Sequence, residues 1–173
     1  MIIIQHDKVS LRPLKQSDIE RLVELANNKN VSINLRDGFP NPYTEKDAEN
    51  FIKICISQDP KAIFAIEFEG LYVGNISLVQ GTDVYRRSAE IGYFLGERYW
   101  NKGIMTRAVN LICDYGFKNL DIERIHTGVF DYNSSSQRVL EKCGFNKEGT
   151  FRRAIFKNGK FLDEIRYSKL RNE

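Results

Sequence analysis

The amino-acid sequence predicts an α+β fold in which helices flank a mixed, mostly antiparallel central sheet. Three observations predict this class. Apolar residues recur at helical spacing in some segments, apolar runs of strand length occur in others, and one strand–helix–strand crossover over residues 88–130 stands among hairpin connections. No linker rich in proline, glycine or serine interrupts the chain, so residues 1–173 are expected to form a single domain.

The spacing of apolar residues in each segment predicts whether it forms a strand or a helix. The expected strands lie at residues 8–13, 62–68, 72–79, 88–95, 124–130, 151–156 and 161–170. The expected helices lie at residues 17–26, 44–55, 103–118 and 134–143.

Local signals set the ends of these elements. Ser17 and Glu20 have the spacing of a capping box for the first helix. Thr44 follows a proline-rich turn and is the expected N-cap of the second helix, which should end before Pro60.

Glycines mark several of the expected turns. Gly70 lies in the expected hairpin connection between the second and third strands. Gly144 is the expected left-handed residue after the last helix. Asn158-Gly159 is a strong two-residue hairpin signal between the last two strands.

The composition is that of a globular protein without a strong charge bias. Hydrophobic residues make up 42%, charged residues 28%, and the formal net charge is +3, which does not indicate a nucleic-acid partner. The odd set of Cys55, Cys113 and Cys143 lacks a CxxC pair and predicts three small buried residues, no metal site and a reducing cytoplasm. No signal peptide or membrane-spanning run is recognised, so no membrane partner is expected.

The junction before the third helix has the features of a phosphate-binding turn. The N-terminus of a helix carries unpaired backbone N–H groups and a partial positive charge. Gly103 leaves those groups uncovered, and Lys102 and Arg98 lie near enough in sequence to add positive charge. A single glycine before a helix is more often a plain turn, so these residues alone are weak evidence for a phosphate site.

The surrounding residues resemble a known family. The segment Trp100-Asn101-Lys102-Gly103-Ile104-Met105 resembles the Q/R-x-x-G-x-G/A motif of the GNAT superfamily of acetyltransferases. Residues 133–145 look like its second motif, N-x-x-S-x-R-V-L-E-K-x-G-F, and residues 11–14 and 40–44 are similar to the subgroup of ribosomal-protein N-terminal acetyltransferases. The resemblance covers about residues 8–170 and implies a GNAT-like acyl-CoA N-acyltransferase fold.

The first motif departs from the family pattern at two positions. Trp100 replaces glutamine or arginine, and Met105 replaces a small residue. Two interpretations are open for Met105: its side chain crowds the pyrophosphate, or it points into the core.

The resemblance also implies a cosubstrate and its contacts. Acetyl-CoA would lie in a V-shaped cleft where strand 88–95 splays from strand 124–130. The residues that it implies for binding are Phe94, Leu95, Trp100, Asn101, Lys102, Gly103, Ile104, Met105, Thr106, Asn133 and Ser136. The acceptor amine would attack the thioester directly, without a nucleophilic cysteine or a metal.

The proton transfers define two candidate catalytic residues. An alkylamine with a pKa near 10 is mostly protonated at pH 7, so a base is needed. Glu90 resembles the acidic residue of related enzymes, the alternative being a salt-bridged or solvated strand residue. Ser136 is the candidate donor to the leaving thiolate because Leu140 stands where relatives carry a tyrosine, the alternative being an N-terminal cap.

His6 and His126 are expected to be surface or strand residues with no catalytic part.

Other functions remain open at this point. A non-catalytic acyl-CoA sensor or an interaction module would use the same fold without needing Glu90 or Ser136. Among enzymes, the acceptor is a protein N-terminus, a polyamine or another small amine, and the protein is a monomer or a homodimer.

Overall fold

The computed structural model describes residues 4–58 and 62–173, which form two compact units. The first unit contains the chain up to Ser77 together with Tyr93–Ile112, and the second contains Leu78–Gly92 and Cys113–Glu173. The strand order is β1-β2-β3-β4-β5-β6-β8-β7. The pairs β1–β2, β2–β3, β3–β4, β6–β8 and β7–β8 are antiparallel, and the pair β5–β6 is parallel. The predicted α+β class is confirmed.

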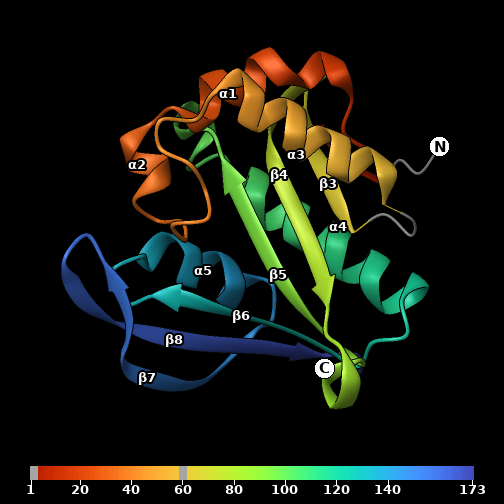
Figure 1. Ribbon diagram of the computed structural model, residues 1–173. Coiled ribbons are helices and arrows are strands. Elements are labelled where there is room, and N and C mark those ends of the chain that lie inside the picture. Colours follow the sequence, from red (N-terminus) through yellow and green to blue (C-terminus); the bar gives the residue numbers. More distant parts are fainter. Residues whose placement is uncertain (1–3, 59–61) are drawn as a thin grey trace. The chain divides into compact units, whose positions relative to one another are not determined.

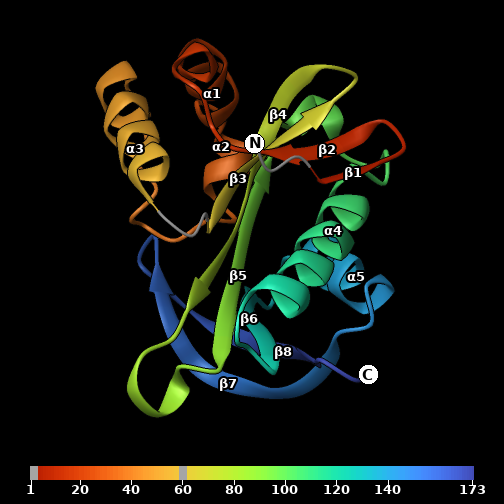
Figure 2. The same ribbon diagram turned by 90° about the vertical axis from the view of Figure 1, so that its right-hand side faces the viewer.

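The first unit is built on an antiparallel set of strands. These are β1 (Ile4–His6), β2 (Val9–Arg12), β3 (Ile63–Phe68) and β4 (Leu71–Gln80), of which β4 continues into the second unit. All four residues of β2 are buried, which requires cover on both faces. Figure 2 shows that cover within the first unit: α1 (Ile19–Ala26) and α3 (Glu45–Ser57) lie on one face of the strands, and the first half of α4 (Ile104–Asn119) lies on the other.

Helices α1 (Ile19–Ala26), α2 (Lys29–Ser32) and α3 (Glu45–Ser57) of the first unit share one apolar cluster. The unit also contains the first half of α4 (Ile104–Asn119) and short 3₁₀ turns at Gln16–Asp18 (η1) and Glu97–Tyr99 (η3). Leu22, Leu25 and Ile52 lie in the core cluster with Tyr72 of β4. Helices α1 and α3 lie side by side, as Figure 1 shows. Thr44 caps α3 as predicted, in a capping box with Asp47. The prediction for Pro60 lies outside the described residues.

Of the helices that the structure describes, none combines the length and the apolar character that a membrane crossing requires.

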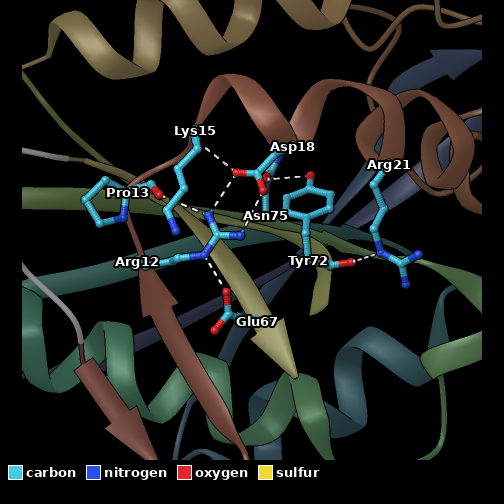
Figure 3. Close-up of polar contacts among 8 residues, drawn as sticks. All are labelled: Arg12, Pro13, Lys15, Asp18, Arg21, Glu67, Tyr72 and Asn75. Carbon is cyan, nitrogen blue, oxygen red and sulfur yellow. Dashed lines mark hydrogen bonds and ion pairs between the residues drawn. The ribbon is translucent and has the colours of Figure 1, made fainter. Parts of the chain in front are cut away.

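The predicted capping box of Ser17 and Glu20 is wrong. The chain enters a 3₁₀ turn at Gln16, and the carboxylate at this entry is Asp18, which accepts a hydrogen bond from the backbone N–H of Lys15 at 2.9 Å. Asp18 is buried because it also binds the guanidinium of Arg12 through two hydrogen bonds of 2.8 Å (Figure 3). The ion pair with Arg12 therefore makes Asp18, rather than Glu20, the acidic residue that caps this turn.

Arg12 makes further hydrogen bonds beside this ion pair. The Nε of Arg12 donates to Glu67 of β3 at 2.6 Å, and its Nη1 also donates to the carbonyl of Pro13 at 3.1 Å. The Asp18 hydrogen bond, followed by Glu67, raises the pKa of Arg12 against the opposing effect of burial. The cluster joins β2 and β3 to the start of α1.

Asp18→Ala should lower the free energy of unfolding by about 3 kcal/mol, because it leaves a buried guanidinium without its main partner. Urea denaturation measures this change. Lys8→Ala is the matched control, since it breaks the exposed ion pair between Lys8 and Glu69 and should leave the midpoint nearly unchanged. Equal midpoint shifts in both variants would contradict a stabilising role for the buried pair.

The second unit contains the remaining strands and helices. They are β5 (Ser88–Leu95), whose end lies in the first unit, β6 (Arg124–Phe130), β7 (Asn146–Lys157), β8 (Lys160–Leu170), the second half of α4, α5 (Ser134–Lys142) and the turn η2 (Asp83–Tyr85). The bounds of β5 and β6 match the predicted strands, whereas β7 begins earlier than predicted. Gly144 (φ +82°), Asn158 (φ +50°) and Gly159 (φ +74°) have the left-handed conformations that the C-cap and the hairpin turn require.

The two faces of β6 and β8 differ in character. Ile125, Val129, Ile165 and Tyr167 are buried on one face, where the Tyr167 hydroxyl donates to Glu141 of α5 at 2.9 Å. The residues that alternate with them include the polar, half-buried Arg124, His126, Glu164 and Arg166, together with Gly128 and the buried Phe130 and Ser168. One covered face and one polar face is the usual pattern of an antiparallel pair.

Candidate functional site

The predicted phosphate turn is an exposed loop of unusual backbone conformation in the first unit. Asn101 (φ +60°) and Gly103 (φ +70°) are left-handed on either side of Lys102, and all three residues are exposed. The helix α4 begins directly afterwards at Ile104. Its first N–H groups have no partner within the helix and carry the positive end of its dipole, so they are suited to an anion.

The turn is fixed from beneath by apolar side chains. Ile104 and Met105 are buried, so the Met105 side chain points into the core and leaves the outer surface of the turn uncrowded. The indole Nε1 of Trp100 donates to the carbonyl of Leu95 at 2.8 Å, and its ring packs against the core cluster. Trp100 therefore anchors the turn to the end of β5.

Residues just before the turn are held by α1 and α2. Glu97 accepts hydrogen bonds from the amides of Asn28 at 2.6 Å and Asn30 at 2.8 Å, and these bonds lower the pKa of Glu97. Arg21 of α1 donates to the hydroxyl of Tyr99. The sequence showed no sign of these contacts, because they join segments about 70 residues apart.

Positive charge gathers around Tyr99. Arg21, Arg98 and Lys102 lie over its ring at 5.8, 5.3 and 5.6 Å from the centroid. Arg98 also pairs with Glu24 at 2.9 Å. That Lys102 and Arg98 add positive charge for an anion at the turn stays a prediction.

The end of β5 makes close backbone contacts within the first unit. A Cβ on Gly74 of β4 would lie 2.2 Å from the carbonyl oxygen of Phe94, so glycine is required there. The Phe94 ring contacts Phe39 edge-on at 5.4 Å. The carbonyl of Leu95 already accepts the Trp100 indole. Phe94 and Leu95, which the family resemblance assigns to the pantetheine arm, are thus held firmly in place.

Asn133 and Ser136 are brought together in the second unit. The Oδ1 of Asn133 accepts a hydrogen bond from the backbone N–H of Ser136 at 3.2 Å, which makes Asn133 the N-cap of α5. Ser136 is therefore not the cap, the alternative considered for it from the sequence. Both residues stay predicted site residues at the start of α5.

Glu90 lies in the parallel pair of β5 and β6, directly opposite His126. The described register runs from Ser88–Arg124 to Glu90–His126, whereas β6 continues to Phe130. Register partners point to the same face of a sheet. His126, for which the sequence indicated no catalytic part, therefore shares a face with Glu90, and only the strand register reveals it.

The cysteines are free and buried, as predicted. Burial raises the pKa of Cys113 to about 12 and that of Cys143 to about 11. These thiols are protonated at neutral pH and unsuited to nucleophilic attack. Within residues 4–58 and 62–173, no group of three or more histidine, cysteine or acidic side chains is arranged to hold a metal ion.

The comparisons with known proteins identify the family of this chain. The model of the "Acetyltransferase (GNAT) domain" family matches residues 8–146. The spermidine N(1)-acetyltransferase of Escherichia coli is 32% identical over 91% of this chain and 83% of its own length. The probable N-acetyltransferase YjcK of Bacillus subtilis is 41% identical over 69% of this chain, and the match spans 60% of that relative.

Solved structures show the same fold. A GNAT-family acetyltransferase from Bacillus anthracis has a TM-score of 0.87 and 27% identity, covering 99% of this chain and 100% of that one. The microcin C7 self-immunity acetyltransferase MccE, solved with acetyl-CoA and AMP, has a TM-score of 0.82 and 26% identity over 95% of this chain and 93% of its own. From the family match and these relatives, the chain belongs to the GNAT acetyltransferase family of enzymes.

Proposed function

We propose that this protein transfers the acetyl group of acetyl-CoA to a primary amine. The observation that carries the proposal is the exposed left-handed turn Asn101–Gly103 at the start of α4, within a GNAT domain. The acetyl-CoA complex of MccE supports the same cosubstrate here. Acetyl-CoA supplies the activated acetyl thioester.

The turn would hold the pyrophosphate of this cosubstrate. The backbone N–H groups from Asn101 to Thr106 are the proposed donors, and Lys102 adds a charge on the exposed side. The side chains of Trp100 and Ile104 would contribute by fixing the turn rather than by polar contact with the cosubstrate. Asn133 is proposed to reach the pantetheine arm or the thioester with its amide, while its oxygen caps α5.

The chemistry needs proton transfers at the amine and at the thiolate. The acceptor ammonium first loses a proton, which we assign to Glu90, directly or through water, and Glu90 later releases it to solvent. The amine nitrogen then forms a bond to the acetyl carbon as the carbon–sulfur bond breaks. The CoA thiolate gains a proton from the Ser136 hydroxyl, and the second proton that the nitrogen loses restores this hydroxyl.

The acceptor is a polyamine, a protein N-terminus or another small amine. The similarity to the E. coli relative named spermidine N(1)-acetyltransferase supports a polyamine acceptor. Acceptors are best compared by measuring CoA release with spermidine, with short peptides that have free N-termini, and with small alkylamines. A protein that binds acetyl-CoA but acetylates none of these acceptors would fit the non-catalytic sensor instead.

Acetyl-CoA should raise the melting temperature, because a ligand that binds only the folded state stabilises it by about 2.7 kcal/mol at 100 times its Kd. Differential scanning calorimetry with increasing acetyl-CoA measures the shift. Desulfo-CoA, which keeps the pyrophosphate, should give a similar shift, and adenosine should give none. No shift with millimolar acetyl-CoA would contradict the cosubstrate assignment.

A further inference from the structure

A row of ionisable side chains lies on the polar face of the second unit. Glu90 of β5 is the register partner of His126 of β6. His126 is hydrogen-bonded to Arg166 of β8, and Arg166 is paired with Glu164 of the same strand. All four are half-buried. The proposed function so far uses only Glu90, so the other three need an explanation.

The contact between Arg166 and His126 decides where the histidine carries its proton. The Arg166 Nη2 lies 3.3 Å from the His126 Nδ1. A guanidinium is always protonated and can only donate. The Nδ1 must therefore offer a lone pair, and the neutral ring carries its proton on Nε2. A doubly protonated ring would bring two N–H groups face to face.

Arg166 is held in this position by several neighbours. Its Nη1 donates to the Glu164 Oε1 at 2.9 Å, with side-chain exposures of 24% and 16%. Its guanidinium lies over the Phe151 ring at 5.6 Å from the centroid. A Cβ on Gly128 would lie 1.6 Å from the Glu164 Oε1, so the glycine makes room for the carboxylate that holds Arg166.

The charges around His126 also favour the neutral ring. Burial is the largest cause that lowers the pKa of His126, followed by Arg166, and Arg124 acts in the same direction. Glu90 on β5 and Glu148 on β7 oppose this change. Arg124 and Ser168 donate hydrogen bonds to Glu148, and these bonds lower the pKa of Glu148 to about 2.

We propose that His126 is a positioning residue for Glu90, held by Arg166 as a neutral ring that directs its Nε2–H toward the Glu90 carboxylate. The inference rests on the proposed role of Glu90 as the base. A neutral donor orients a carboxylate and leaves it able to accept a proton. An imidazolium at the same place would form an ion pair with Glu90 and weaken it as a base. Arg166, Glu164 and Gly128 serve to exclude that state.

The tautomer of His126 tests the geometry without any assay of activity. The chain has two histidines, so ¹⁵N-detected NMR of the imidazoles resolves His126 from the exposed His6. We expect the Nε2–H tautomer in the unmodified protein. Arg166→Met should raise the titration midpoint of His126 and mix its tautomers, whereas the control Arg87→Met, which breaks an exposed pair with Asp121, should change neither. An Nδ1–H tautomer, or an unchanged His126 in Arg166→Met, would overturn the inference.

Kinetics test the link to Glu90. His126→Leu should lower kcat by roughly tenfold to a hundredfold with little change in the KM for acetyl-CoA. His126→Gln, which keeps a side-chain donor, should recover most of this loss. In a background of Glu90→Gln, His126→Leu should cost little more, because the two residues act as one unit.

Additive losses in the double variant would overturn the positioning role even if both single variants are slow. An absence of turnover in the unmodified protein would instead remove the proposed function, and with it the role of Glu90. The NMR result would still decide the arrangement of Arg166 and His126.

Discussion

Gly103→Val should weaken acetyl-CoA binding by roughly 100-fold, the effect of losing about two charge-assisted hydrogen bonds of ~1.5 kcal/mol each. The residue has φ +70°, and it precedes the exposed first turn of α4. A Cβ there would lie 3.1 Å from an Nη of Arg107, so the side chain would crowd this face of the turn. Isothermal titration calorimetry with acetyl-CoA and with CoA measures the loss.

The backbone strain of this variant needs a matched control. Gly70 in the β3–β4 turn has φ +80°, lies in the same unit and has open space around its Cβ position. Gly70→Val should therefore lose a similar amount of stability, on the order of 1–3 kcal/mol, while keeping its affinity for acetyl-CoA. Equal affinities of a folded Gly103→Val and the unmodified protein would show that the turn does not bind the pyrophosphate.

Glu90→Gln should lower turnover by roughly 10²–10⁴-fold at neutral pH, because the amide cannot take the proton of the attacking amine. The affinity for acetyl-CoA should change little. The loss should shrink as the pH rises toward the pKa of the amine, near 10, since free amine then forms without a base. Steady-state rates between pH 6.5 and 9.5 measure both parts of this expectation.

Glu123→Gln is the control for this experiment. Glu123 lies in the same unit, is exposed and pairs with Arg87, so its substitution should leave the pH profile of turnover unchanged. A loss in Glu90→Gln that is equal at every pH would indicate that Glu90 positions the acceptor. No loss at all would leave Glu90 as a structural residue of β5, with an ordered water as the remaining route for the proton.

Elements with strong local patterns could be predicted from the sequence. The strands β5 and β6 were predicted at their observed bounds, because apolar residues largely alternate with other residues along each of them, between polar turns. The Thr44 cap, the Gly144 C-cap and the Asn158-Gly159 turn also follow from local chemistry. The short elements β1 and α2 were missed because segments of three or four residues have too little periodicity to be recognised.

The candidate site likewise combines features that could be predicted from the sequence with features that depend on packing. The glycine before α4 and the asparagine before α5 could be located from the sequence, whereas the left-handed conformation of Gly103 and the capping role of Asn133 come from the structure. The sequence did not show that Met105 is buried or that Trp100 binds the Leu95 carbonyl, because both depend on the packing beneath the turn.

Only the tertiary structure decided the contacts between distant segments. Asp18 closes the turn before α1 because Arg12 and Glu67 bury its carboxylate, while the local spacing favoured Glu20. His126 stands beside Glu90 through the register of a parallel pair, and a shift of one residue would turn it to the other face. Local chemistry along the chain therefore determined the elements and the turn, whereas burial and strand register, which act between distant residues, decided the electrostatic neighbours of the site.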